Sequence, residues 1–583
     1  MNNRIPQGPV IDQWTYYDYK PTFDGPQGGL APSWVHPDHR RRLQSYKMLE
    51  SYYRNSARQW LDKTTTDQRA ISDRREYGDA ELITETALAS LIGADQSIIV
   101  PAQDSPQAPQ AAIDQLNVLL AWAEDERFIQ KVLELERTTI RLGDGCYVLG
   151  WDNNKGRPRL HVYDPGFYFP VLDESQLGEE EFPKKVHIAY EFEEKVSGTQ
   201  TRRYLRRMTW ELLPIGYHDA DGNPVGFDDP NMVLFENEAI NPDTAELMRQ
   251  YPWNTDPVTE SCFYTDATWE LNSSPVYMDD LDLNAAIVSA DQIDLMIDFI
   301  PVVHVPCTVA MKEHFGTPVI ARVMQLVDDI ISTDTDLQAS SAITGTPPIA
   351  VSGASLPKND DGTIKSYGPG TTWETGDGTA TMIDTSTSLD ALLKYTDHLR
   401  QLLAVNSRTP ESLLGRIKPS EVPSGIALTL SFAPHTALIR EMRLVRKDKY
   451  STLLKFVVRM FMNSGDLIEY FPADVKFGSF LPADKQETST LVQQLLTSKA
   501  ISLETGVRML VEAGFPIESA LEEVFLIRSN DFATANALLD ATGDVNAVRD
   551  YLGLGPVAPL DLAGLEETVA GLPAAPPEEQ PIP

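Results

Sequence analysis

Two stretches in the middle of the chain carry apolar residues at helical spacing. After Pro318, a stripe of Val, Ile, Met and Leu runs from Val319 to Ile331, and a second stripe runs from Leu389 to Leu403. Repeats at three and four residues place such a stripe on one face of a helix. The spacing predicts helices over 317–337 and 387–404, with Thr317 as the N-cap of the first helix and Pro318 in its first turn.

The segments after each predicted helix lose this periodicity. Residues 338–386 are rich in Gly, Ser, Thr, Pro and Asp and keep only two strand-like pieces, around 349–351 and 379–383, so they predict a small insertion between the helices. Residues 405–425 contain Pro410, Pro419 and Pro423, which interrupt helices. They predict a long loop, and loops of that length are usually functional or disordered.

Helical patterns dominate the C-terminal part. One long pattern runs from Ile426 to about Asn463, with a kink expected at Pro434. Shorter patterns follow at 488–499, 503–513, 517–527 and 532–541, separated by turn residues. We expect a small helical domain there, and a disordered tail over 554–583, where Pro, Ala and Glu predominate.

The N-terminal half predicts helices followed by a sheet. Residues 1–40, rich in Pro, Gly and aromatic residues, predict an extended arm. Helical patterns follow at 37–61, 79–92 and 109–142, and strand patterns at 146–151, 159–163, 186–195 and 202–213. A turn is expected at 153–156 between the first two strands. The chain is therefore predicted to be a multidomain α+β protein.

Composition narrows the classes of function. The 85 acidic and 49 basic residues give a formal charge of -36, which argues against a protein that binds nucleic acid by neutralising phosphates. The cysteines Cys146, Cys262 and Cys307 lie far apart and predict no disulfide framework. The apolar stretch Phe299–Met311 is too short and too interrupted to span a membrane. With no secretory signal in the sequence, we expect synthesis in a reducing cytoplasm.

Candidate chemistry is sparse. The sequence contains no phosphate-binding loop, zinc-protease helix or nucleophile elbow of the usual patterns. Asp279, Asp280 and Asp282 could bind magnesium or act in acid–base chemistry, but an exposed acidic turn is the favoured interpretation. His304, between valines and prolines, is expected to be a structural histidine, and Cys146 a small buried residue. We expect no catalytic, cofactor or metal site, and no enzyme activity.

Taken in order, several segments resemble the portal proteins of tailed bacteriophages, of the type common in phages of Gram-positive and actinobacterial hosts. The segments that carry the resemblance are Leu142–Val148, Leu160–Pro165, Ile300–His304, Phe315–Pro318 with its helix, the proline-rich loop and Ser498–Ser502. The resemblance covers roughly residues 45–540, and it depends on order and spacing because none of these motifs is specific alone.

The resemblance implies a division of the chain and a set of partners. It implies a wing over 41–316, stem helices over 317–337 and 387–404, a small α/β clip over 338–386, a tunnel loop over 405–425, a long kinked wing helix over 426–475 and a helical crown over 476–553. It also implies a closed ring, with twelve copies expected, that conducts double-stranded DNA at the portal vertex of a virion assembled in the host cytoplasm. Further partners would be the terminase large subunit, a head–tail adaptor, and the major capsid and scaffolding proteins.

Basic residues in the predicted tunnel loop form the candidate DNA-facing site. Arg408, Arg416 and Lys418 outnumber Glu411 and Glu421 there, although the whole chain is acidic. One hypothesis is that they make brief, sequence-independent phosphate contacts with DNA. The alternative is that they only pair with neighbouring carboxylates.

A second basic run follows on the long predicted helix. Arg440, Arg443 and Lys447 share one face at helical spacing, and Arg446 and Lys449 lie between and beyond them. We expect this run to pair with an acidic neighbouring subunit rather than with DNA.

Two other classes of function remain open from the sequence. One is another phage structural protein, such as an adaptor or a minor head protein. The other is a hydrolase that uses the carboxylates near Asp279.

Overall fold

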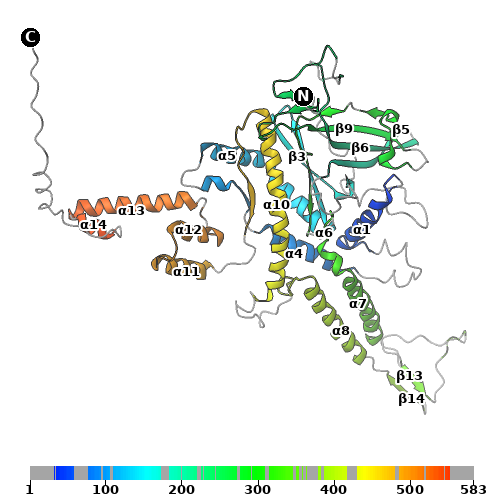
Figure 1. Ribbon diagram of the computed structural model, residues 1–583. Helices are drawn as coiled ribbons and strands as arrows, with labels where there is room; N and C mark the ends of the chain where they lie inside the picture. The colour runs from blue at the N-terminus through cyan, green and yellow to red at the C-terminus, as the bar shows by residue number, and fades with distance from the viewer. Residues whose placement is uncertain are drawn as a thin grey trace, which may run out of the picture. The chain divides into compact units, whose positions relative to one another are not determined.

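The computed structural model describes most of residues 32–551 and shows a mixed helix and sheet protein of the α+β class (Figure 1). Residues outside the description are 1–31, 552–583 and internal gaps, of which the larger are 58–75, 105–108, 173–182, 220–224, 309–313, 353–357, 364–377, 416–429 and 479–484. The chain divides into two compact units, Met1–Phe480 and Leu481–Pro583. Within the described ranges, no helix has both the length and the apolar composition to cross a bilayer.

A six-stranded antiparallel sheet forms one layer of the first unit, in the order β10-β9-β6-β5-β4 with β11 also paired to β9. Its strands are β4 (Tyr168–Val171), β5 (Lys185–Ser197), β6 (Gln200–Pro214), β9 (Glu260–Glu270), β10 (Val288–Ser289) and β11 (Ile293–Asp294). The predicted strands at 186–195 and 202–213 are confirmed as the β5–β6 hairpin, in which Ile188 pairs with Met208.

A three-stranded antiparallel sheet, β12-β2-β3, lies deeper in the core. It comprises β2 (Asp144–Asp152), β3 (Arg157–Tyr163) and β12 (Val302–Pro306). The predicted hairpin at 146–163 is confirmed, and Gly156 supplies the positive φ of +62° that its turn needs. Cys146, Tyr147 and Val148 are fully buried.

Four helices follow in this unit: α1 (Pro37–Tyr53), α4 (Asp79–Ile92), α5 (Gln110–Asp125) and α6 (Phe128–Leu142). Three of them contact these sheets, and the fourth, α4, packs against α6 and the long helix α10 (Ala433–Ser464). The single helix predicted at 109–142 is wrong, because Arg127 adopts a left-handed φ of +52° and separates α5 from α6. The last residues of the predicted arm belong to the core: Trp34 is 2% exposed, and its Nε1 donates to Glu191 Oε2 at 3.1 Å.

Shorter elements complete the first unit. The strands are β1 (Gln96–Ile99), β7 (Glu238–Ile240), β8 (Leu247–Arg249) and β15 (Asp474–Phe477), and the 3₁₀ turns are η1 (Pro101–Asp104), η2 (Pro165–Phe167), η4 (Met278–Asp280) and η5 (Leu283–Ala285). The strand β1, which follows α4, pairs antiparallel with β15, which lies near the end of the first unit.

The long helix α10 (Ala433–Ser464) runs through the first unit beside the three-stranded sheet (Figure 1). Its 32 residues correspond to about 48 Å at 1.5 Å per residue. The predicted kink at Pro434 is wrong, because Pro434 lies in the first turn, where its missing N–H breaks no hydrogen bond.

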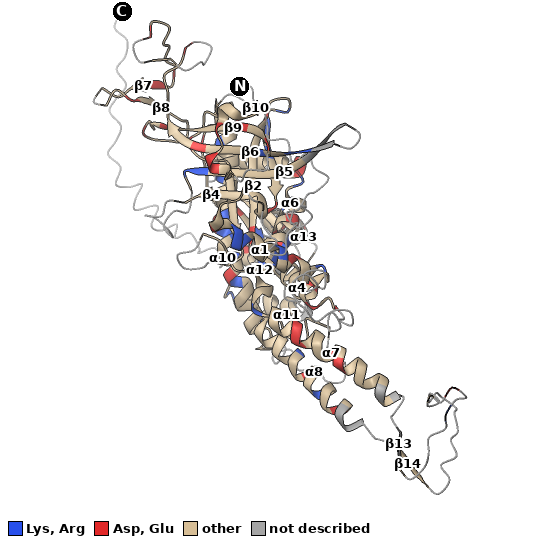
Figure 2. Cartoon of the chain, turned by 90° about the vertical axis from the view of Figure 1, so that its right-hand side faces the viewer, with Lys and Arg blue, Asp and Glu red and all other residues tan. Residues whose placement is uncertain are grey.

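Two helices, α7 (Met324–Gly345) and α8 (Ser386–Asn406), lie side by side and lead to the antiparallel strands β13 (Ile349–Ser352) and β14 (Thr379–Met382) (Figures 1 and 2). Both strand predictions are confirmed. The start predicted for the first helix is wrong, because Val319–Arg322 forms the 3₁₀ turn η6 and α7 begins after it. Thr317 is not its N-cap; its carbonyl accepts a hydrogen bond from the Thr308 hydroxyl.

The second unit contains α11 (Lys485–Thr497), α12 (Leu503–Glu512), α13 (Ala520–Thr542) and α14 (Val545–Tyr551). Ser502 caps α12 by accepting the Thr505 N–H at 3.2 Å. The two helices predicted at 517–527 and 532–541 are one continuous helix, α13, since the intervening Arg528–Asp531 contains no residue that stops a helix. The tail predicted over 554–583 lies outside the described residues.

Candidate functional site

The α7–α8 pair is held by an apolar seam and one ion pair. Val327, Ile330 and Leu403 are at most 3% exposed and belong to the core cluster of the first unit. Arg400 Nη2 lies 3.0 Å from Asp334 Oδ2, and Asp334 is 8% exposed. The seam and the ion pair together hold the two helices in one register.

Arg408, the first of the predicted loop cations, lies just beyond the end of α8. The Thr409 N–H donates to the Ala404 carbonyl, and Arg408 takes a left-handed φ of +56°, so the chain turns sharply away from the helix. The Arg408 guanidinium lies 3.6 Å from Glu441 on α10, and both side chains are partly exposed. This contact favours pairing with a carboxylate over a free, DNA-facing cation. Arg416 and Lys418 lie outside the described residues.

A small cavity lies beside Arg408. Its lining comes from η6, the end of α8 and α10, and includes Arg322, Asn406, Arg408 and Glu441. The volume is about 20 Å³, close to that of one water molecule. The cavity is therefore too small for a substrate or a nucleotide.

Two arginines of the basic run on α10 bind groups of their own chain. Arg446 is fully buried and its Nη2 lies 2.7 Å from Glu136 Oε2. Arg443 Nη2 donates to the Gly478 carbonyl at 2.7 Å and to the Ser90 carbonyl at 3.1 Å, and burial lowers the pKa of Arg443. Arg443 therefore has partners within its own chain, and pairing of the basic run with a neighbouring subunit stays a prediction.

The acidic turn near Asp279 has structural roles. Asp282 caps η5 by accepting the Asn284 N–H at 2.9 Å. Asp279 lies 3.6 Å from Nε2 of the buried His187, and burial raises the pKa of Asp279. Within the described ranges, no three His, Cys, Asp or Glu side chains come together as metal ligands.

His304 has the structural role that was predicted. Its Nε2 lies 2.8 Å from Asp144 Oδ1, which also accepts the Gly316 N–H at 2.8 Å. The ring stacks on Tyr168 and on His314. Burial raises the pKa of the Cys146 thiol on the same strand as Asp144, as expected for a core cysteine rather than a nucleophile.

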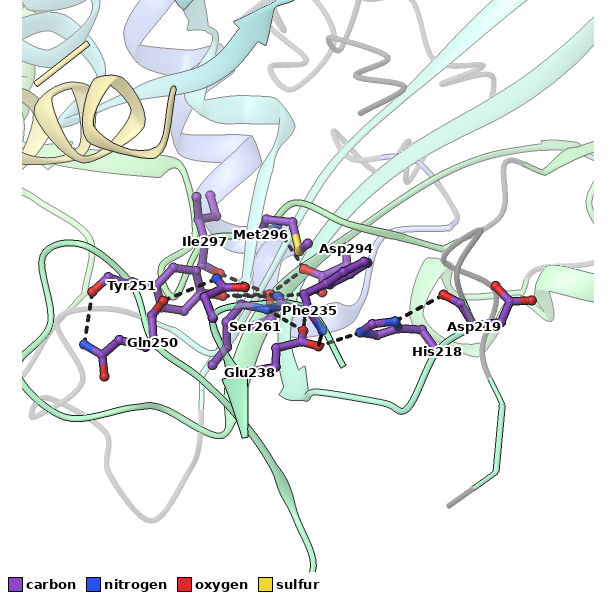
Figure 3. A network of polar contacts seen from close by, with 12 residues as sticks. His218, Asp219, Phe235, Glu238, Gln250, Tyr251, Ser261, Asp294, Met296 and Ile297 are labelled. Carbon is purple, nitrogen blue, oxygen red and sulfur yellow. Dashed lines mark hydrogen bonds and ion pairs between the residues drawn. The ribbon is translucent and has the colours of Figure 1, made fainter. Parts of the chain in front are cut away.

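A buried polar network joins β7, β8, β9 and β11 (Figure 3), and Arg249 donates hydrogen bonds to the members on the other three strands. Arg249 lies 2.7 Å from Glu238 and 2.8 Å from Asp294, and the Ser261 hydroxyl donates to Asp294 at 2.5 Å. His218 Nε2 lies 2.8 Å from Glu238. Burial by itself would raise the pKa of Glu238, but hydrogen bonds, including that from Arg249, outweigh it and the pKa is lowered.

This network has residue types found in hydrolases, but its connections differ. Ser261 pairs with Asp294 while His218 pairs with Glu238, so the serine–histidine contact that activates a nucleophile is missing from these described residues. Ser261 is fully buried. The sequence did not reveal the network, because its members come from four strands and, for His218, from a segment outside them.

No protein-family model matches the chain, and no curated protein matches it either.

Proposed function

We propose that this chain is the portal protein of a tailed bacteriophage, a structural subunit that closes into a ring around the DNA channel. The observation that carries the proposal is the α7–α8 pair, which leaves an α+β body, leads to the β13–β14 hairpin and returns to that body. A turn at Arg408, the long helix α10 and a separate helical unit then follow in that order. A subunit whose paired helices line a pore would have this arrangement.

In this proposal each part has a role. The two sheets with α1, α4, α5 and α6 form the wing, α7 and α8 the stem, and the β13–β14 hairpin the clip. The segment after Asn406 forms the tunnel loop, α10 the long wing helix and α11–α14 the crown. The clip begins after Gly345, because α7 continues through residues 338–345.

The ring would nucleate head assembly, dock the terminase large subunit during packaging and later bind the head–tail adaptor. It would also contact the capsid and scaffolding proteins at one vertex of the virion. The chemical work of packaging would belong to the terminase motor.

The acidic composition supports a channel through which DNA moves without binding to the wall. A formal charge of -36 per chain disfavours adhesion of phosphates to the wall, so double-stranded DNA could be driven past it. Phosphate contacts by Arg416 and Lys418 remain a prediction, while the contact of Arg408 with Glu441 supports the alternative for that residue.

End-on imaging of the purified full-length protein tests the proposal. We expect negative-stain micrographs to show closed rings with a central opening, and light scattering to give the mass of many chains. A uniform monomer would contradict it. Stabilisation of such a monomer against heat by magnesium would favour the carboxylate hydrolase instead.

A further inference from the structure

An apolar patch lies at one edge of the six-stranded sheet. Its members are Leu283 on η5, Ile287, and Val288 on β10, and they are 42%, 56% and 59% exposed. No charged residue lies between Leu283 and Ser289. The strand β10 is the outermost strand beside β9 (Figure 2). Proteins usually cover an apolar sheet edge with another segment, because an open edge invites pairing with other chains. We call these three residues the edge patch.

The last residues of the N-terminal arm are anchored near the edge patch. Trp34 Nε1 donates to Glu191 on β5, and the Met278 N–H donates to the Trp34 carbonyl at 2.9 Å. Residues 1–31, which precede this anchor, lie outside the described residues. Ile287 follows Met278 by only nine positions along the chain. The arm therefore meets the segment that carries the edge patch.

The register of the sheet places the anchor and the edge patch at one level. Glu191 pairs with Leu205, and Leu205 pairs with Trp269, so these three side chains share one face of the sheet. Trp269 Nε1 donates to the Asp282 carbonyl at 2.8 Å, which places the start of η5 on that face. The residue before Trp269 pairs with Val288. The path from the anchor to the edge patch therefore runs straight across the strands.

The chain before the anchor is long enough to follow this path. Three strand spacings of about 4.8 Å separate β5 from β10, which is about 14 Å in all. Residues 24–31 span up to about 26 Å at about 3.3 Å per residue. Three of them, Gly25, Gly28 and Gly29, are glycines, which adopt turns that other residues disfavour. The segment that ends at Phe23 is therefore within reach of the edge patch.

This segment has the composition to bind an apolar surface. Five of the ten residues in 14–23 are aromatic: Trp14, Tyr16, Tyr17, Tyr19 and Phe23. Aromatic side chains bury large apolar areas and are favoured in extended segments beside a sheet. A short linker between two groups of one chain gives a local concentration on the order of millimolar. The arm of the same chain therefore has an advantage over the arm of another copy.

We propose that the segment Trp14–Phe23 binds the edge patch of its own chain and covers Leu283, Ile287 and Val288. The contact goes beyond the proposed function, because it lies within one chain and does not depend on the assembly of copies. It gives the aromatic residues of the arm a surface to bind and closes the open edge of the sheet.

Cysteine cross-linking tests this contact in the full-length protein. The three native cysteines are fully buried, so introduced cysteines at exposed positions should react first with a bifunctional maleimide. Tyr17→Cys combined with Ile287→Cys should give about tenfold more internally linked chain than Tyr17→Cys combined with Val171→Cys. Peptide mapping by mass spectrometry measures the linked fraction.

Val171 is a matched control for the length of the arm. It is 45% exposed and lies on β4, at the opposite edge of the same sheet. Phe169 on β4 contacts the Trp34 ring with centroids 5.8 Å apart, so the arm can reach this edge as well. A difference between the two cysteine pairs therefore reports a preference for the edge patch and not the reach of the arm.

Hydrogen exchange tests the edge patch without introduced cysteines. The double variant Ile287→Ser and Val288→Ser should exchange the amides of residues 14–23 about tenfold faster than the unmodified protein, because the segment then leaves the patch more often. Val171→Ser should leave this exchange unchanged. All three positions are exposed, so circular dichroism of the variants should match that of the unmodified protein.

Three results would overturn the proposal. The first is equal internal linking of Tyr17→Cys to Ile287→Cys and to Val171→Cys. The second is unchanged exchange of residues 14–23 in the double serine variant. The third is a link between residues 17 and 287 that joins two chains on a denaturing gel, which would assign the edge patch to the arm of a neighbouring copy. The presence or absence of rings in micrographs changes none of these readouts, so the proposed function is tested separately.

Discussion

Arg446 illustrates how single residues hold the first unit together. Its guanidinium lies 2.7 Å from Glu136 and donates to the Pro306 carbonyl at 3.0 Å, and the Tyr450 hydroxyl donates to Glu136 at 2.9 Å. Burial alone would lower the pKa of Arg446, but the Glu136 carboxylate outweighs this effect, so the arginine stays charged. One ion pair thus joins α6, β12 and α10.

Removing the charge of Glu136 should destabilise the protein strongly. Glu136→Gln leaves a buried guanidinium without its counter-charge, which costs about 3–5 kcal/mol in the free energy of unfolding. Urea denaturation of the variant checks this value. The matched change Glu260→Gln, in an exposed pair with Lys184, should alter stability by less than about 1 kcal/mol. Equal effects of the two changes would contradict the assignment.

His187 links stability to pH. Burial, assisted by the charge of Arg207, lowers the pKa of this histidine from 6.5 to about 3, and its Nδ1 lies 2.8 Å from the Thr209 hydroxyl. A histidine that is neutral when folded is protonated more readily in the unfolded chain. Its contribution to stability is therefore complete above pH 6.5 and is lost as the pH falls towards 3.

His187→Gln should flatten this pH dependence, because the glutamine amide can still hydrogen-bond Thr209 but cannot be protonated. Between pH 7 and pH 5, the unmodified protein should lose about 2 kcal/mol more stability than the variant. Urea denaturation at the two pH values measures the difference. The same loss in both proteins would show that His187 does not carry the effect.

At the scale of elements, the approach to α7 depends on two glycines. Gly143 ends α6 with a φ of +103° and its carbonyl accepts the Cys307 N–H at 2.7 Å. Gly316, just before η6, lies so close that a Cβ there would be 2.6 Å from the Cys307 nitrogen and nearer still to the Gly143 carbonyl. The backbone atoms of Gly143 and Cys307, together with the Pro306 Cβ, leave no room for a side chain.

Gly316→Ala should therefore force the start of the α7 segment away from the core. Overpacking of this kind costs about 1–3 kcal/mol in the free energy of unfolding, which thermal or urea denaturation would detect. Gly216→Ala is the matched control, because a Cβ at Gly216 meets nothing within 4 Å. Its stability should stay within about 0.5 kcal/mol of the unmodified protein. A neutral Gly316→Ala would contradict the tight junction.

At the scale of the whole molecule, charge and assembly are connected. A chain with a formal charge of -36 repels its own copies, so a ring of such chains needs local contacts that oppose this repulsion.

Patterns within a few residues were sufficient to predict many elements. Alternation identified β5 and β6, and the turn after Asp152 identified the β2–β3 hairpin. The helix predicted at 79–92 has the same limits as α4. These features depend on local periodicity and turn chemistry, which the order of residues alone determines.

The remaining features required contacts between distant residues. The break at Arg127, the pairing of β1 with β15, and the choice of Arg446 rather than Arg440 for burial all depend on what packs against those positions. The α7 and α8 stripes were visible in the sequence, but only the packing of the two helices showed that Asp334 pairs with Arg400. Side-chain type and spacing are local properties, whereas the tertiary structure decides which residues are buried and which residues they pair with.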